Sequence, residues 1–251
     1  MLLACVLVIV CIGALYLAGN LARFQEAISV KESQTALQGI DDPGQLEQVL
    51  KQHPSNRILK MVALANRDSI ESDAAMRRLL NEAEPRDLSK PASLTESSRA
   101  DLEALGRELK TAKSNAATVM PRYVALLKTA RDKLEHDARP LEVGNYTLAK
   151  FTAMIDEQHK DMTAIMPEAL AARVEYDSAY EQCVSLLIRH FGDYKVVNGQ
   201  PVFPSQSAAD SYNVAATAMT AVAKRMARLE SERAALRQSQ LTRWKTFVEA
   251  R

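Results

Sequence analysis

The stretch of sequence that decides the fold is "LEALGRELKTAKSNAATVMPRYVALLKTA", residues 102–130. Apolar or small side chains recur in it at alternating steps of three and four residues, from Leu102 to Ala130, for about four heptads. Such a seam is typical of a long amphipathic helix that packs against other helices. Similar seams follow from Leu148 to Leu187 and from Tyr212 to Phe247. The sequence therefore predicts an all-α fold, in which residues 93–251 form an elongated, antiparallel, coiled-coil-like bundle of three helices.

Local signals mark the ends of these three helices. Ser93 followed by Glu96 is a capping box, which predicts the start of the first helix. A break is expected at residues 138–145, and Ser205 or Ser207 is expected to cap the third helix. The seam of the third helix becomes polar near its end, so we expect its last turns to leave the bundle.

A proline lies inside each of the first two long helices, in Met120-Pro121 and in Met166-Pro167. A proline in the middle of a helix removes one backbone hydrogen bond and kinks the helix. The two prolines are nearly equally far from the turn near residue 142, so in an antiparallel pair they would lie at about the same level. The sequence predicts matched kinks there.

The N-terminus is strongly apolar. Residues 2–19 carry no charge and are about as long as the core of a bilayer requires. A cleaved signal peptide would need a basic start and a small-residue cleavage site, and neither is convincing here. Lipidation would need a small residue before the modified cysteine; the apolar run continues past Cys5, and the bulky Val10 precedes Cys11. We therefore expect residues 1–20 to be an uncleaved transmembrane anchor, with the bulk of the chain outside the cytoplasm.

Three regions separate the anchor from the bundle. Residues 21–40 are a polar, helical neck, residues 41–84 hold short helices, and residues 85–92 are a linker rich in proline and polar residues.

The short-helix region is expected to contain three helices. The first begins with Asp41 or Asp42 as N-cap and Pro43 at its first position, and it ends at His53-Pro54. A second helix carries Ile58 to Leu64, and a third begins near Ile70 and ends before Pro85.

The helical pattern breaks at residues 194–203, "YKVVNGQPVF", around Asn198-Gly199. Asn-Gly predicts a tight hairpin turn, because both residues tolerate positive φ. In the resulting register Val197 faces Gln200, and Val196 faces Pro201 at a position where the proline loses no ladder bond. One face of this β-hairpin is wholly apolar and consists of Tyr194, Val196, Pro201 and Phe203. We expect that face to pack on the bundle as a structural cap; a lid over a ligand or partner is the alternative.

The segment at residues 194–213 resembles a family of uncharacterised bacterial envelope proteins, a domain of unknown function with lipoprotein members. The shared pattern consists of Asn198-Gly199, Phe203-Pro204-Ser205, Ala208 or Ala209, and Tyr212-Asn213. The resemblance implies a helical bundle with a small hairpin in the bacterial envelope, and it implies no known activity. The chain differs from the lipoprotein members because it lacks a convincing lipidation signal.

The sequence carries little that points to catalysis. A net charge of +1 provides no basic footprint for nucleic acid, and the three cysteines form no disulfide or zinc pattern. Asp156 and His159 have a spacing that could place two metal ligands on one helix face, but no second copy of the motif accompanies them. Cys183 lies on an apolar seam and is expected to be a small core side chain. We expect no enzyme activity, no metal and no cofactor.

Two surfaces are candidates for binding a protein partner. The hairpin offers Tyr194, Val196 and Phe203, and the basic C-terminal stretch offers Arg237, Arg243, Trp244 and Lys245. The alternative for the C-terminal stretch is a solvated flank of a bundle helix.

The function expected from the sequence is that of a non-enzymatic, single-pass scaffold or interaction protein of the bacterial inner membrane, with its bulk in the periplasm. Residues 2–19 would bind the membrane, and the helical seams would bind a protein partner or a second copy. The alternative is a helical bundle that binds a lipid or a small molecule.

Overall fold

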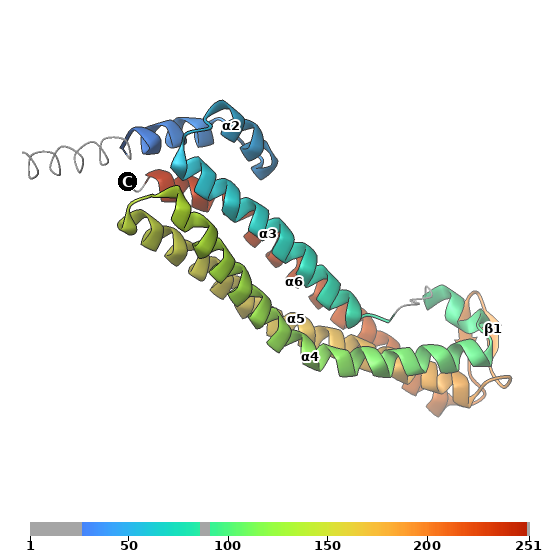
Figure 1. Cartoon of the computed structure of the whole chain (residues 1–251). Helices are drawn as coiled ribbons and strands as arrows, with labels where there is room; N and C mark the ends of the chain where they lie inside the picture. The colour runs from blue at the N-terminus through green and yellow to red at the C-terminus, as the bar shows by residue number, and fades with distance from the viewer. Residues whose placement is uncertain (1–26, 86–90, 250–251) are drawn as a thin grey trace, which may run out of the picture. The chain divides into compact units, whose positions relative to one another are not determined.

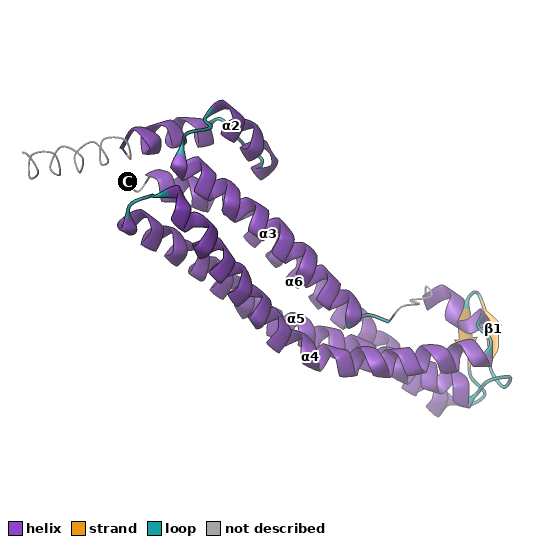
Figure 2. Cartoon of the chain, viewed as in Figure 1, coloured by secondary structure: helices purple, strands orange, loops and turns teal. Residues whose placement is uncertain are grey.

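The computed structural model describes residues 27–85 and 91–249. Residues 27–38 are helical. The later elements are η1 (Pro43–Gln45), α2 (Leu46–Gln52), α3 (Arg57–Glu82), η2 (Pro91–Glu96), α4 (Arg99–Ala138), η3 (Arg139–Leu141), α5 (Asn145–Arg189), β1 (Lys195–Val197), β2 (Gln200–Val202) and α6 (Gln206–Glu249) (Figure 1). The described chain is therefore mostly helical with one two-stranded antiparallel sheet, as the sequence predicts (Figure 2).

The predicted membrane anchor, residues 1–20, lies outside the described residues, as do residues 21–26 of the predicted neck. The neck is helical from residue 27 to residue 38, as expected. Within residues 27–85 and 91–249, no helix combines the length and the apolar character that crossing a membrane requires.

The first short helix has the predicted ends. The Asp42 side chain accepts a hydrogen bond from the Gly44 N–H at 2.8 Å, and Pro43 is the first residue of η1. Helix α2 continues from η1 and is capped at its C-terminus by His53.

Helix α3 takes the place of two predicted helices. Arg57–Glu82 is one helix of 26 residues, so the break expected between Leu64 and Ile70 is wrong. No glycine or proline interrupts this segment, and its polar middle can therefore remain helical. Asn66 is buried there, and its Nδ2 donates a hydrogen bond to the Pro43 carbonyl oxygen at 3.3 Å.

Helix α4 begins later than predicted. Its first residue is Arg99. Ser98, just before the helix, and Asp101, in its first turn, form a reciprocal capping box. The Asp101 N–H donates to Ser98 Oγ and the Ser98 N–H donates to Asp101 Oδ2, both at 3.2 Å. The predicted cap of Ser93 and Glu96 is wrong, because these residues belong to η2. The sequence contains two such signals in close succession, and the spacing alone does not rank them.

The described chain divides into two compact units. Unit 1 comprises the residues up to Ile70, Ala130–Gln158 and Gln238–Arg251, and unit 2 comprises Glu71–Thr129 and His159–Arg237. Each unit contains a part of α3, α4, α5 and α6. The predicted bundle of three helices is therefore corrected: α3 packs with α4, α5 and α6 in the core of unit 1 and with α4 and α5 in a cluster of unit 2.

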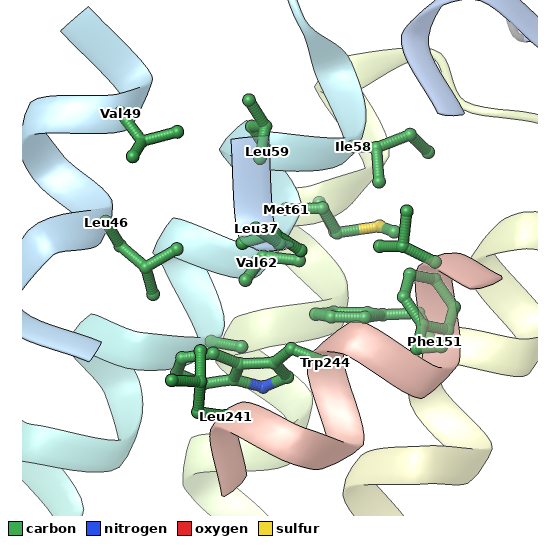
Figure 3. Close-up of a cluster of buried hydrophobic side chains, with 14 of the residues drawn as sticks. Leu37, Leu46, Val49, Ile58, Leu59, Met61, Val62, Phe151, Leu241 and Trp244 are labelled. Atoms are coloured by element: carbon green, nitrogen blue, oxygen red, sulfur yellow. The ribbon is translucent and has the colours of Figure 1, made fainter. Parts of the chain in front are cut away.

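Trp244, from the last turns of α6, is completely buried in the core of unit 1 (Figure 3). Phe247 follows on the same helix, and its ring lies 5.6 Å from that of Phe151 on α5, centre to centre. The prediction that the last turns of α6 leave the bundle is wrong. The core also contains Leu37, Ile40, Leu46, Val49, Ile58, Leu59, Met61, Val62, Ala65, Leu134, Ala138, Ile155, Leu241 and Val248.

Unit 2 contains two apolar clusters. One includes Leu105 of α4, Cys183 of α5 and Met219 of α6, and the other includes Val119 of α4 and Met166 of α5. Met120 packs against the second cluster, to which Met166 belongs. The residues that precede the two helix-internal prolines thus contribute to one apolar cluster; the equal level of the prolines and their matched kinks remain predictions.

Candidate interaction surface on the hairpin

The hairpin has the register that its sequence predicts. Val197 pairs with Gln200, Val196 with Pro201, and Lys195 with Val202. The turn residues Asn198 and Gly199 have φ values of 53° and 75°. Positive φ at both central positions is the feature that makes Asn-Gly the preferred hairpin turn.

Aromatic side chains fix the base of the hairpin to unit 2. Phe203 is buried, and its ring centre lies 5.9 Å from that of Tyr194, 5.7 Å from that of His190 and 5.3 Å from that of Tyr212. Helix α6 then begins at Gln206, and Ser205 is its cap, because Ser205 Oγ accepts a hydrogen bond from the Ala208 N–H at 3.3 Å. Of the two predicted caps, the structure selects Ser205.

A second support comes from η2, which the sequence did not connect with the hairpin. Strand β2 lies against η2, and Thr95 Oγ1 donates a hydrogen bond to the Gly199 carbonyl oxygen at 3.5 Å. Leu94 is buried in the same cluster as Phe203. About a hundred residues separate these partners in sequence, and no local pattern reports a pairing over such a distance.

Only part of the predicted apolar face is buried. Phe203 is buried and Tyr194 and Pro201 are half-buried, whereas Val196, closer to the tip, is 42% exposed. The expectation that Val196 packs on the bundle is therefore wrong. Burial on this face therefore decreases from Phe203 at the base of the ribbon to Val196 near its turn.

All four residues on the opposite side of the ribbon are exposed. We call this side the outer face, and it consists of Lys195, Val197, Gln200 and Val202. Val197 is 51% exposed and Val202 is 52% exposed. Two valines thus face solvent on a ribbon whose base is held by buried aromatic rings.

The predicted C-terminal surface residues have other roles in the structure. Arg237 forms ion pairs with Asp73 and Glu230, and Lys245 Nζ donates a hydrogen bond to the Ile40 carbonyl oxygen at 2.7 Å. Trp244 is a core residue of unit 1 without accessible surface, and Arg243 is half-buried. The hairpin residues belong to unit 2, so Trp244 and Tyr194 do not share one compact unit.

Buried charges form a feature of unit 2 that the sequence did not reveal. Asp177 is completely buried, and Arg173 pairs with it at 3.3 Å and with Glu84 at 3.1 Å. Burial raises the pKa of the Asp177 carboxyl, while the charge of Arg173 acts in the opposite direction. Asp177 directly follows Tyr176, which lies in the apolar seam predicted from Leu148 to Leu187. This position is the sequence feature that could have indicated the burial of Asp177.

A second buried polar group lies around Tyr123. Its hydroxyl has no hydrogen-bond partner within the described chain, and neither does Nε of the buried Arg233. Burial raises the pKa of Tyr123 to about 12, despite the nearby positive charge of Arg233. Arg233 Nη2 instead lies 3.8 Å from the sulfur of Met76.

Asp156, considered above for metal binding, forms an ion pair, and Cys183 lies in the core. Asp156 pairs with Arg131 at 3.2 Å, and residues 27–85 and 91–249 contain no cluster of three or more His, Cys, Asp or Glu side chains suited to a metal. Cys183 is buried beside the sulfur of Met219, as expected for a core side chain, and burial raises its pKa to about 11. A thiol in that state is a poor nucleophile at neutral pH.

The described surface includes the following hollows. One, of about 490 Å³, lies in unit 2 between the end of α3 and the polar side of α4, and it includes Glu82, Arg107 and Asn115. Another, of about 350 Å³, lies in unit 1 between the helix at residues 27–38 and the end of α2, beside Ile28 and His53.

Comparison of the chain with known protein families, with curated proteins and with solved structures finds no match.

Proposed function

We propose that the protein is a non-enzymatic helical scaffold of the bacterial envelope, which binds a protein partner through the outer face of its hairpin. Residues 2–19 hold it in the inner membrane as a single-pass anchor, and the bulk of the chain lies in the periplasm. The anchor rests on the uncharged apolar run, and the envelope rests on the resemblance at residues 194–213.

The observation that carries the proposal is the exposure of Val197 and Val202 on a supported ribbon. An isolated hairpin is marginal in water, but here the buried Phe203 and its aromatic neighbours order the base of the ribbon. An ordered apolar surface loses little conformational entropy when a partner covers it. Exposed apolar side chains on a connection that a rigid framework supports are typical of an interaction surface.

The observation that favours the alternative function is the hollow beside Ile28. Ile28, Thr35, Ala36 and His53 line it, together with the oppositely charged Lys31 and Glu32. The apolar part of the wall fits the end of an acyl chain, and the adjacent charges of Lys31 and Glu32 fit a polar headgroup that carries both signs of charge. Under this alternative, lipid co-purifies with the protein, and Ile28→Asp removes it.

The experiment for the principal proposal compares affinity purifications of the full chain from crosslinked cells. The double variant Val197→Asp/Val202→Asp should lose the protein that recurs with the wild-type chain, because two carboxylates in an apolar contact would each have to be desolvated. The control is Val124→Asp on α4, at a valine that is 47% exposed in the same unit.

Retention of the partner by the double variant would contradict the proposal, as would equal loss in the Val124→Asp control. Crosslinking to a second copy of the chain would identify the partner as the protein itself. A reporter that is active only in the periplasm, fused after Arg251, tests the sidedness separately; an inactive reporter contradicts the periplasmic assignment.

A further inference from the structure

The two halves of α3 are held to their neighbours by different forces. In the first half, Arg57 to Ile70, six apolar residues are buried in unit 1: Ile58, Leu59, Met61, Val62, Ala63 and Ala65. In the second half, Glu71 to Glu82 in unit 2, Met76 is the one buried apolar residue, and Ala83 follows just beyond the helix. Leu79 and Leu80 are half-buried. Burial of apolar surface is the main source of helix docking, so the second half is the more weakly docked.

Ion pairs at the edges of the second half supply what the apolar contacts lack. Asp73 pairs with Arg237 of α6 at 3.3 Å, and Glu82 makes a two-pronged contact with Arg122 of α4. Just after the helix, Glu84 pairs with Arg173 of α5 at 3.1 Å. We call residues 71–84 the clasp segment, since each of the three other long helices holds it by a charged side chain.

The Glu82–Arg122 pair of the clasp segment is open to solvent, whereas Asp73 and Arg237 are 21% and 32% accessible and Arg173 is 12% accessible. Between 46% and 51% of the side chains of Glu82, Arg122 and Glu84 is accessible. Exposed pairs of this kind are weak and are screened by salt, because the Debye length falls from about 10 Å at 0.1 M to about 3 Å at 1 M ionic strength.

The surface beneath the clasp segment is partly polar. The Tyr123 hydroxyl, Arg233 Nε and Arg173 Nη2 are buried without a hydrogen-bond partner among the described residues. Unsatisfied buried polar groups favour the entry of water, so exposing them on release of the segment recovers hydration that the closed state withholds. Arg173 also keeps its ion pair with the buried Asp177 when Glu84 moves away. Release of the segment therefore leaves neither Arg173 nor Asp177 as an unpaired buried charge.

We propose that the clasp segment is a salt-released strap. At low ionic strength the three ion pairs close it over α4, α5 and α6. Screening of those pairs lets residues 71–84 open while the apolar first half of α3 stays docked in unit 1. Opening exposes Tyr123 and the partly apolar surface that Met76 covers in the closed state. Another amphipathic helix with acidic ends can then bind to this surface. The strap is thereby an internal competitor for that surface, and this role is independent of the hairpin surface.

Hydrogen exchange of the purified full chain, read by mass spectrometry at 0.05 M and 1 M NaCl, tests the proposal. We expect amide exchange in residues 72–84 to be about ten-fold faster at the higher salt, from weakening of the three ion pairs, above all the exposed Glu82–Arg122 pair. Residues 58–66 of the same helix should exchange slowly at both concentrations and serve as the internal control. Equal exchange of the two halves at both concentrations would overturn the proposal.

Two variants separate the clasp pairs from charge effects in general. Arg122→Gln and Arg237→Gln each remove a cation that holds the segment from another helix, so exchange at low salt should approach the high-salt rate. The matched control is Arg77→Gln, which removes a pair with the same Asp73 from within α3 and should leave exchange unchanged. An Arg77→Gln effect as large as that of Arg237→Gln would contradict the strap. Far-UV circular dichroism confirms that each variant is folded.

Discussion

The environment of Cys183 is unlike that of a catalytic thiol. This residue is buried between α5 and α6, and its sulfur lies 3.8 Å from that of Met219. Its pKa is raised from an ordinary value of 9.0 to about 11 because burial penalises the thiolate. The folded state therefore keeps the proton at a pH where the unfolded chain has lost it.

This difference predicts a specific loss of stability in alkali. Since the folded pKa is the higher one, the contribution of Cys183 is complete below pH 9 and is lost as the pH rises through about 11. The free energy of unfolding should fall by up to roughly 2–3 kcal/mol more in the wild type than in Cys183→Ala over this range. Urea titrations at pH 8, 9, 10 and 11 measure both curves. Parallel curves would show that Cys183 does not contribute.

The wild type and Cys183→Ala have to be compared with each other because other groups titrate in the same pH range. Tyr123 has a pKa of about 12, also raised by burial, and it lowers the stability of both proteins alike at high pH. The difference between the two curves isolates the thiol. The neutral-pH offset between them reports the packing lost with the sulfur and is expected to be about 1 kcal/mol.

At the scale of elements, the hairpin and helix α4 each contain a glycine whose replacement by alanine should have opposite effects. Gly199 has φ of 75°, and a Cβ there would meet no atom within 4 Å, so its cost is purely conformational. Gly199→Ala should destabilise the ribbon by about 1–2 kcal/mol. Gly106 lies inside α4, and its Cβ would make an ordinary 3.8 Å contact with Val184. Gly106→Ala should stabilise by about 0.5–1 kcal/mol.

The two glycine variants control for each other, because the chemical change is identical. Thermal unfolding measures the overall effect, and amide exchange of Val197 and Gln200 reports the ribbon itself. Destabilisation by both substitutions, or by neither, would contradict the assigned backbone conformations.

The same elements show what a sequence predicts well. The register of β1 and β2 follows from Asn198-Gly199 and Pro201 alone, because a two-residue turn fixes every pair in a hairpin. Asp42 and Ser205 are each one of two neighbouring candidates that the sequence predicts as caps, because an N-cap depends on residues within one turn. Local interactions decide these features, so local sequence suffices.

Features decided by distant residues were missed or misjudged. Val196 stays exposed, although it shares its face of the ribbon with the buried Phe203 and although β2 lies against η2. Helix α3 was divided at its polar middle because the burial of Asn66 against η1 leaves no trace in a periodic pattern. The ion pairs of the clasp segment likewise join side chains far apart in sequence.

At the scale of the whole molecule, the division into two units does not follow the order of the chain. Its four boundaries fall at Ile70, Thr129, Gln158 and Arg237, inside α3, α4, α5 and α6 respectively. The heptad seams predict long helices. They do not predict the position along each helix at which its packing neighbours change from those of one unit to those of the other. Trp244 illustrates the consequence, since its core neighbours include Leu37 and Phe151, and a basic C-terminal stretch gave no sign of them.

Continuity of these helices predicts that the two units unfold together. Helix propagation is cooperative, so loss of structure in one unit removes the hydrogen-bonded turns that precede or follow in the other. Trp244 is the single tryptophan and reports unit 1 by fluorescence, while thiol labelling of Cys183 reports unit 2 in a Cys5→Ser/Cys11→Ser background. Phe151→Ala in the core of unit 1 should cost about 3–5 kcal/mol and lower both urea midpoints equally. Tyr146→Ala, 68% exposed on the same helix, should change either midpoint by less than about 0.5 kcal/mol. A midpoint that shifts for Trp244 and stays in place for Cys183 would establish that the units unfold independently.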